Sequence, residues 1–229
     1  MILGGAGFFR EETKVVRRVA EWLPMRRTLV PDASGAPLFG LIAPSLIAVV
    51  AALASGGSMA HWARARLRWS PLALLALGVQ IPLYSAPFNT WPLVVAIGAG
   101  AGIATTALVL LVILGNARGP LRLTGGLAAL GIVLNLTVML ANGGWMPRAD
   151  AIAPRAMQRA ADESIVNNTT PMSGETHLAW LGDVIPQPAW WPMANLVSLG
   201  DLFLALGAAG CAFAITRGRL PVETDLVTC

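Results

Sequence analysis

Long apolar stretches without charged residues divide this chain of 229 residues. The charge-free stretches cover residues 33–60, 69–117, 123–147 and 193–215, and only Asp201 interrupts the last of them. A helix crosses the hydrocarbon core of a bilayer with roughly 20 apolar residues, so the second stretch can hold two helices joined by a turn. The pattern predicts five transmembrane helices, near residues 37–54, 71–84, 92–115, 125–141 and 199–216.

The predicted turn inside the second stretch is rich in helix-breaking residues. Residues 85–92 read Ser-Ala-Pro-Phe-Asn-Thr-Trp-Pro, and the helix before them is short and contains Gln80 and Pro82. Backbone groups in lipid must be hydrogen-bonded within their own element, which favours helices. A soluble helical bundle is disfavoured because no stretch has the polar outer stripe that it requires. We therefore expect an all-α membrane protein with about five transmembrane helices and a long, partly helical outer loop.

Composition agrees with this class, because 55% of the residues are hydrophobic and only 12% are charged, against about 25% charged in soluble domains. The expected organisation has five parts: an amphipathic N-terminal extension (1–36), four transmembrane helices (37–142), an extracytoplasmic cap loop (143–192), a fifth transmembrane helix (193–216) and a cytoplasmic tail (217–229). Apolar residues at helical spacing over residues 11–23 predict a helix lying on the membrane surface. Arg26-Arg27 before an apolar run is also compatible with a twin-arginine signal.

Arginines in the short loops predict the orientation. The loops after the first and third predicted helices, together with the tail, contain Arg64, Arg66, Arg68, Arg118, Arg122, Arg217 and Arg219. Basic loops stay in the cytoplasm, so we expect a bacterial cytoplasmic (inner) membrane protein whose long fourth loop is extracytoplasmic and whose C-terminus is cytoplasmic. The basic residues of the N-terminal extension fit this orientation less well.

The fourth loop, at about 50 residues, is long enough to have a function of its own. We expect helical structure near residues 156–166, followed by a segment rich in tryptophan and proline over residues 177–191. One interpretation is an outer cap that lies on the bilayer, and the other is a surface for a ligand or a partner. The candidate contact residues are Asn142, His177, Trp180, Asp183 and Asp201.

Several polar residues have a structural interpretation beside a functional one. Ser198 and Asp201 have the spacing of a capping box at the start of the last helix, although an acid near the membrane is also a candidate proton or cation site. Asp183 is expected to form a turn or cap and to make a salt bridge with Arg148. A metal site at His177, Asp183 and Asp201 lacks a further ligand at a recognisable spacing, so no metal is expected.

Other polar and small residues predict helix packing. Asn135 and Asn142 share one helix face, and amides in lipid form hydrogen bonds between helices. Gly98, Gly102 and Thr106 form a stripe of small residues that allows another helix to approach closely.

Motifs for chemistry are missing from the sequence. It has no Gly-x-Ser-x-Gly elbow, zincin pattern or phosphate-binding loop, and Cys211 and Cys229 have no metal-ligand spacing. His61 is expected to be solvated, with ligation of a pigment as the alternative. The net charge of +4 is scattered along the chain, which argues against nucleic-acid binding. We expect no catalytic residues and no cofactor.

Three motifs with their joint spacing resemble a known family. They are Asn-Gly-Gly-Trp-Met-Pro (142–147), His-Leu-Ala-Trp-Leu-Gly-Asp-Val-Ile-Pro (177–186) and Ser-Leu-Gly-Asp (198–201), and the basic stretch 64–69 fits too. Over residues 38–218 the chain resembles a family of uncharacterised bacterial multi-pass membrane proteins, a domain of unknown function. The resemblance implies several membrane helices and a long outer loop, without an established activity. The long N-terminal extension departs from the family pattern.

These features predict a non-catalytic accessory or scaffolding subunit of a larger membrane complex, of respiratory or photosynthetic type, whose partners are the lipid bilayer and other membrane subunits. The alternative is a small-molecule or lipid binder or transporter that uses the outer loop as a lid and Asp201, Asn142 and His177 as polar contacts. A polar cavity that reaches these residues would favour the binder. A dry bundle with an exposed apolar flank would favour the subunit.

Overall fold

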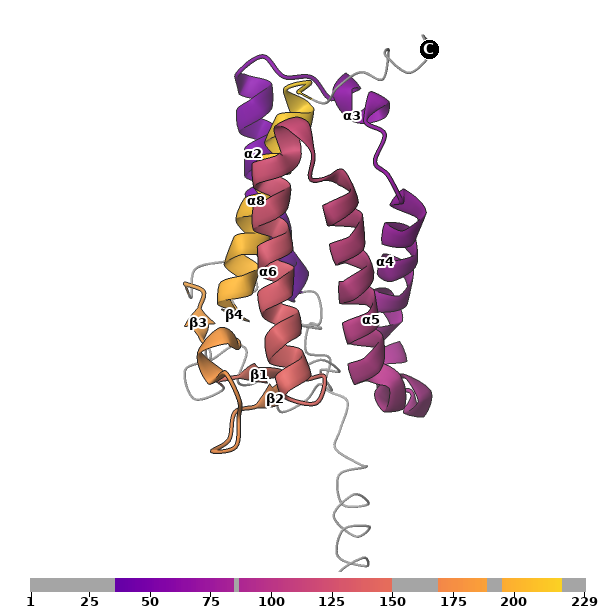
Figure 1. Ribbon diagram of the computed structural model, residues 1–229, viewed down its shortest axis with the longest axis vertical. Helices are drawn as coiled ribbons and strands as arrows, with labels where there is room; N and C mark the ends of the chain where they lie inside the picture. Colours follow the sequence, from indigo (N-terminus) through magenta and orange to yellow (C-terminus); the bar gives the residue numbers. More distant parts are fainter. Residues whose placement is uncertain (1–35, 85–86, 150–168, 189–194, 220–229) are drawn as a thin grey trace, which may run out of the picture. The chain divides into compact units, whose positions relative to one another are not determined.

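The computed structural model describes residues 36–84, 87–149, 169–188 and 195–219 (Figure 1). Its long helices are α2 (Ala36–Ala54), α4 (Ser70–Tyr84), α5 (Pro92–Asn116), α6 (Arg122–Ala141) and α8 (Leu199–Thr216). Each of the five stretches predicted to be helical therefore contains a helix. The N-terminal extension, the predicted helix near residues 156–166, and residues Trp190 and Trp191 lie outside the described residues.

Three of these helices, α5, α6 and α8, are long and apolar enough to cross a membrane. Helix α4 has 15 residues, which at 1.5 Å per residue gives a length of about 22 Å. It contains Pro82, as expected from the sequence, and α2 contains Pro44. The chain is thus mostly helical, with three helices that meet the requirements of a membrane span.

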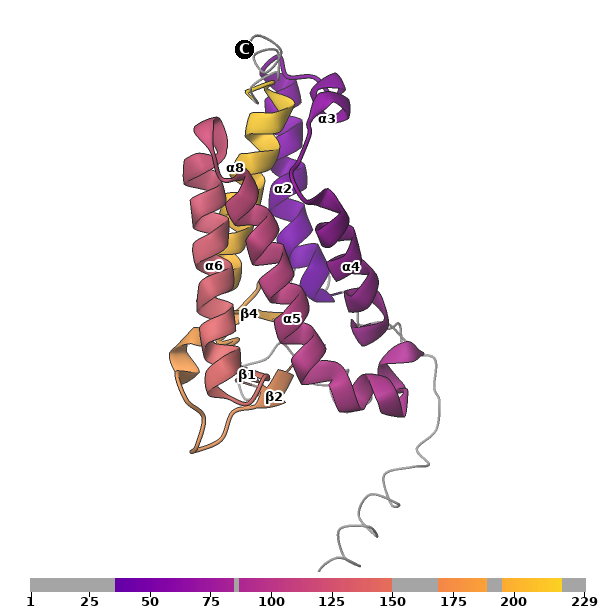
Figure 2. The same ribbon diagram turned by 45° about the vertical axis from the view of Figure 1, so that its right-hand side comes forward.

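The helices pack in an order that differs from their order along the chain. Helix α8 contacts both α2 and α6, α6 also contacts α5, and α5 contacts α4 (Figures 1 and 2). The last helix therefore lies between the first and the fourth long helix. Short elements connect the others: α3 (Ala60–Arg64), η2 (Phe88–Thr90) and η3 (Gly119–Leu121).

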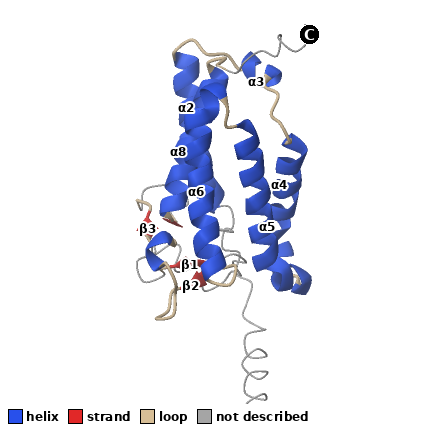
Figure 3. Ribbon diagram, in the orientation of Figure 1, coloured by secondary structure: helices blue, strands red, loops and turns tan. Residues whose placement is uncertain are grey.

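The fourth loop contains short strands that the sequence pattern did not predict (Figure 3). Strand β1 (Met146–Arg148) pairs in parallel with β2 (Thr169–Pro171), and β3 (Ile185–Pro186) pairs antiparallel with β4 (Leu196–Val197). Strands of two or three residues are too short to show an alternating pattern, so the sequence gives no signal for them. The 3₁₀ helix η5 (Ala179–Leu181) lies between β2 and β3.

A small apolar core joins this loop to the helices. Val138 and Met139 of α6 pack with Met146 and Leu181, and all four side chains are buried. Partly buried Ile103, Leu134 and Leu199 surround them. The loop is therefore anchored at the end of α6 where α8 begins, which positions the candidate residues described next.

Candidate functional site

Helix α8 begins with the predicted capping box, which the structure confirms. The Asp201 backbone N–H donates to Ser198 Oγ at 2.9 Å, and the Ser198 N–H donates to Asp201 Oδ2 at 3.0 Å. Ser198 is completely buried. The negative charge of Asp201 lies at the positive end of the helix dipole, which stabilises the start of the helix.

Asn135 of α6 extends this capping box across the helix interface. Its Nδ2 donates to Asp201 Oδ1 at 2.8 Å, and its Oδ1 accepts from Ser198 Oγ at 2.9 Å. One amide thus satisfies both side chains of the box from the neighbouring helix. The result is a closed polar network of Asn135, Ser198 and Asp201, which we call the capping network.

Two glycines make this contact possible. A Cβ atom on Gly200 would lie 2.0 Å from Asn135 Oδ1, and one on Gly131 would lie 2.4 Å from the Gly200 carbonyl oxygen. Further along, a Cβ atom on Gly207 would lie 2.4 Å from the Ala128 nitrogen. Helices α6 and α8 therefore approach so closely that only glycine fits at these positions.

Asp183 lies beside the capping network, held by the strand that follows α6. Its N–H donates to the Pro147 carbonyl at 2.8 Å, and its own carbonyl accepts from Ala149 N–H at 3.0 Å. These bonds form a parallel bridge between Asp183 and Arg148, and both residues are buried. We expected a salt bridge here; the structure joins the two residues through their backbones, and the positive charge of Arg148 also acts on the Asp183 carboxyl.

Burial raises the pKa of the Asp183 carboxyl well above its ordinary value. The negative charge of Asp201 raises this pKa further, and the positive charge of Arg148 opposes the shift without cancelling it. The Asp183 carboxyl therefore retains its proton to a higher pH than an exposed aspartate. A neutral carboxyl is a less costly group to bury than a charged one.

Asn142 holds the fourth loop against the end of α6. Its Nδ2 donates to the His177 carbonyl at 2.9 Å, and its Oδ1 accepts from the His177 N–H at 3.0 Å. The His177 contact is thus made by its backbone, and the residue is exposed. Trp180 is 65% exposed. Neither side chain joins the capping network, whereas Asp183 and Asp201 lie close to each other.

The predicted stripe on α5 lies at a different place. Gly98 and Gly102 are buried, and Thr106 Oγ1 donates to the Gly102 carbonyl at 2.7 Å. Gln80 of α4 donates to Thr105 Oγ1 at 3.4 Å, a long hydrogen bond between these two helices. The stripe therefore lies on α5, which packs against α4 and α6.

Sequence reasoning missed a second polar cluster, at the opposite end of α8. His61 Nδ1 lies 2.9 Å from the Thr216 carbonyl oxygen, to which it donates, and Trp62 Nε1 donates to Thr216 Oγ1 at 2.9 Å. The Ser58 N–H also donates to the Thr216 carbonyl, at 2.9 Å. This cluster satisfies the last carbonyl of α8, that of Thr216, and no local spacing connects residues 155 positions apart.

The hydrogen bonds of these polar groups hold the helices and the fourth loop to one another. In the part of the chain that the structure describes, no three His, Cys, Asp or Glu side chains group as a metal site requires. The hydrogen-bonding groups of Asn135, Asn142, Ser198 and Asp201 are engaged within the chain.

Comparison with curated proteins and comparison with solved structures each find no match. A family of unknown function, DUF5317, matches residues 64–213. This range contains the capping network, Asp183 and Asn142, but it begins after α2, later than the resemblance over residues 38–218 suggests. Because the match covers well over half of the sequence, the chain belongs to the DUF5317 family.

Proposed function

We propose that this chain is a multi-pass membrane protein with five spans that acts as a non-catalytic accessory or scaffolding subunit of a larger membrane complex, of respiratory or photosynthetic type. The observation that carries this proposal is the uneven burial of its membrane-length helices. Within their most apolar windows, 39% of α6 and 39% of α8 is buried inside the chain, against 17% of α5. Helix α5 therefore offers the most surface to other molecules.

The exposed face of α5 supports the proposal that a partner helix packs against it. Ala96, Gly100 and Ala104 are exposed and recur at every fourth position, which places three small residues on one helix face. A Cβ atom on Gly100 would meet no described atom within 4 Å, so the packing of the chain does not require a glycine there. Small residues on a lipid-facing helix allow the backbone of a second helix to come close.

The alternative of a binder with the outer loop as a lid has less support. Asn142 and Asp201, which would contact the ligand, already have partners within the chain. An open groove lies on the flank of α6 near Arg122, at the opposite end from the capping network. The polar groups at the outer loop thus favour a structural tie over a binding site.

Charge supports the proposed orientation in a bacterial cytoplasmic membrane. Among the described residues, Arg64, Arg66, Arg68, Arg118, Arg122, Arg217 and Arg219 belong to the end where α3 and the α5–α6 connection lie. The described acidic residues Glu175, Asp183 and Asp201 belong to the end with the strands. By the positive-inside rule, the arginine end is cytoplasmic and the strand end extracytoplasmic.

The test is purification of the untagged native protein in a mild detergent, with identification of every protein that elutes with it. We expect a stoichiometric membrane partner that is lost from Gly100→Leu. Gly78→Leu is the matched control, because Gly78 on α4 is also exposed with no described atom within 4 Å of its Cβ position. A wild-type chain that elutes alone as a monomer would overturn the subunit proposal.

A further inference from the structure

An open groove runs along the flank of α6 at its arginine-rich end. Its lining residues are Gly119, Pro120, Arg122, Leu123, Gly126, Leu127 and Leu130. The lining is mostly apolar, and Arg122 is its charged member. The groove therefore combines a hydrocarbon surface with a single positive charge at one end.

The shape of the groove follows from the sequence of α6. Gly126 is exposed, and a Cβ atom there would meet no described atom within 4 Å, so the missing side chain leaves a shallow channel. Leu123 is 75% exposed and Leu130 is 43% exposed. These leucines leave a large apolar surface uncovered along the channel.

Arg122 is the first residue of α6 and lies at the edge of the apolar segment Gly119–Ala141. The distance along α6 from Arg122 to Leu130 is about 12 Å at 1.5 Å per residue. This is close to half the thickness of a hydrocarbon core of roughly 30 Å. A molecule with an anionic group at Arg122 and a chain reaching Leu130 would fit one leaflet.

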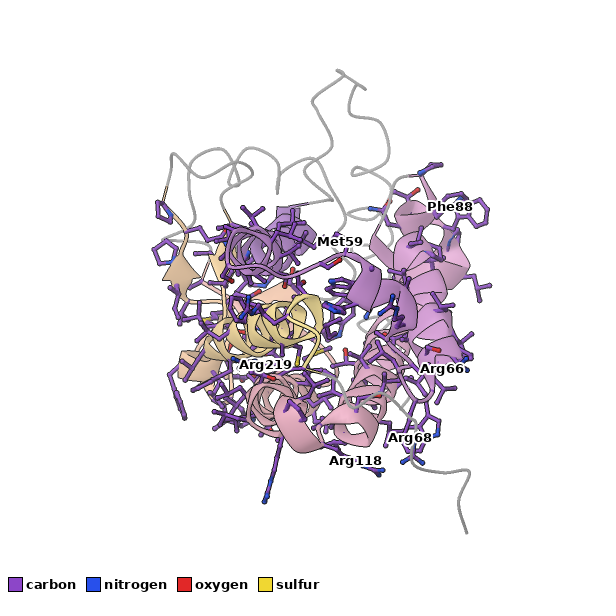
Figure 4. All side chains as sticks on the ribbon, turned by 90° about the horizontal axis from the view of Figure 1, so that it is seen from above. Met59, Arg66, Arg68, Phe88, Arg118 and Arg219 are labelled. Atoms are coloured by element: carbon purple, nitrogen blue, oxygen red, sulfur yellow. The ribbon has the colours of Figure 1, made fainter. Side chains whose placement is uncertain are left out.

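Arg118, four positions before Arg122 in the connection that leads into α6, adds a second positive charge at this end of the groove. Figure 4 views the molecule from above and labels Arg118, together with Arg66, Arg68 and Arg219, which come from other segments. Helix α6 also begins without a side-chain cap and without an acidic residue in its first turn, in contrast to α8. The end of the groove is thus complementary to a phosphate group.

We infer that this groove binds one anionic phospholipid, with the phosphate against Arg122 and an acyl chain over Gly126 toward Leu130. The inference rests on the membrane placement proposed above and is independent of the subunit role. A partner helix is a poorer occupant, because the groove extends only over residues 119–130 and has a charge at its end.

The test uses the full chain in a mild detergent, with mass spectrometry of the intact protein to count bound lipids. Phosphatidylglycerol and phosphatidylcholine of equal chain length are supplied at equal concentration. We expect one tightly bound phosphatidylglycerol and weaker binding of phosphatidylcholine. Arg122→Gln should weaken phosphatidylglycerol binding by about fivefold, the effect of one basic residue near an anionic headgroup.

Matched variants separate charge from shape. Arg66→Gln removes an exposed arginine from the same end outside the groove and should leave binding unchanged. Gly126→Leu should weaken the binding of both lipids by filling the channel, whereas Gly78→Leu should not. Arg122→Lys should retain most of the preference for phosphatidylglycerol, because it keeps the charge.

Four results would overturn the inference. Equal binding of the two lipids, or equal losses from Arg122→Gln and Arg66→Gln, would show that Arg122 does not select the headgroup. Full displacement by inorganic phosphate, with no effect of Gly126→Leu, would show a simple anion site without a chain groove. If neither lipid binds at all, the groove is not a lipid site, and this result leaves the membrane placement unaffected.

Discussion

The α6–α8 pair and the α4–α5 pair are held together in different ways. Between α6 and α8, glycines bring the backbones into contact and the capping network joins the two helices through two short hydrogen bonds. Between α4 and α5, the long Gln80–Thr105 bond is accompanied by a tie from Asn116 to the Arg68 backbone. Helix α4 exposes Leu74, Leu75, Leu77 and Ile81. The first pair has more of its surface covered within the chain, with 39% of each apolar window buried, whereas α5 of the second pair, with 17% buried, leaves more of its surface to lipid or to a partner.

The largest effect is expected from Gly200→Ala. The added Cβ would overlap Asn135 Oδ1 and the Gly131 carbonyl oxygen, both of which belong to the facing helix. Such overpacking against backbone forces the helices apart, so we expect a loss of about 3 kcal/mol in the free energy of unfolding. This loss can be measured by reversible unfolding in mixed micelles, with circular dichroism as the signal. Gly100→Ala on the open face of α5 is the control, and an equal loss there would remove the distinction between the two pairs.

Asn135→Leu should have the next largest effect, about 1.5 kcal/mol, because it leaves Asp201 and Ser198 without their partner on α6. Gln80→Leu removes a bond of 3.4 Å from the other pair and should cost less than about 0.5 kcal/mol. The same unfolding assay compares them. A larger effect at Gln80 than at Asn135 would contradict our assignment of the stronger tie to α6 and α8.

The pH dependence of stability tests the burial of Asp183 beside this tie. Its pKa is raised above the ordinary value of 3.8 in the folded chain, so the folded chain retains the proton after the unfolded chain has lost it. The free energy of unfolding should therefore fall as the pH rises from that value to the raised pKa, by at most about 1.4 kcal/mol per pH unit. Unfolding measured across this range should show the slope in the wild type and a smaller slope in Asp183→Asn. Identical slopes would mean that Asp183 is not buried as described.

A smaller effect than at Asn135 is expected from Thr216→Val at the other end of α8. The substitution keeps the shape but removes the Oγ1 that accepts from Trp62, so we expect a loss of about 1 kcal/mol. Thr137→Val is the control, because Thr137 is exposed and bonds only the Val133 carbonyl of its own helix in the described structure. The unfolding assay should separate the two variants, and equal values would argue against a tie between Trp62 and α8.

Local features of the molecule could be predicted from the sequence, and distant pairings could not. The helices follow from apolar stretches, and the capping box follows from the spacing of Ser198 and Asp201. The helix face on which Asn135 lies was predictable. Its partners lie more than 60 residues away along the chain and depend on which helix packs beside α6. Thr216 and His61 have no shared motif. Arg148 and Asp183 were expected to meet through their charges, and the strand pairing through their backbones, which also brings them together, left no signal in the sequence.

The most direct test of the membrane placement is the labelling of single cysteines in intact cells. A chain with Cys211 and Cys229 replaced by serine would carry either Trp180→Cys in the outer loop or Arg66→Cys at the arginine end, both at exposed positions. We predict that a membrane-impermeant maleimide labels position 180 in intact cells and position 66 only after permeabilisation. Labelling of position 66 but not of position 180 in intact cells would contradict the proposed orientation, and recovery of the chain in the soluble fraction would contradict the membrane placement itself.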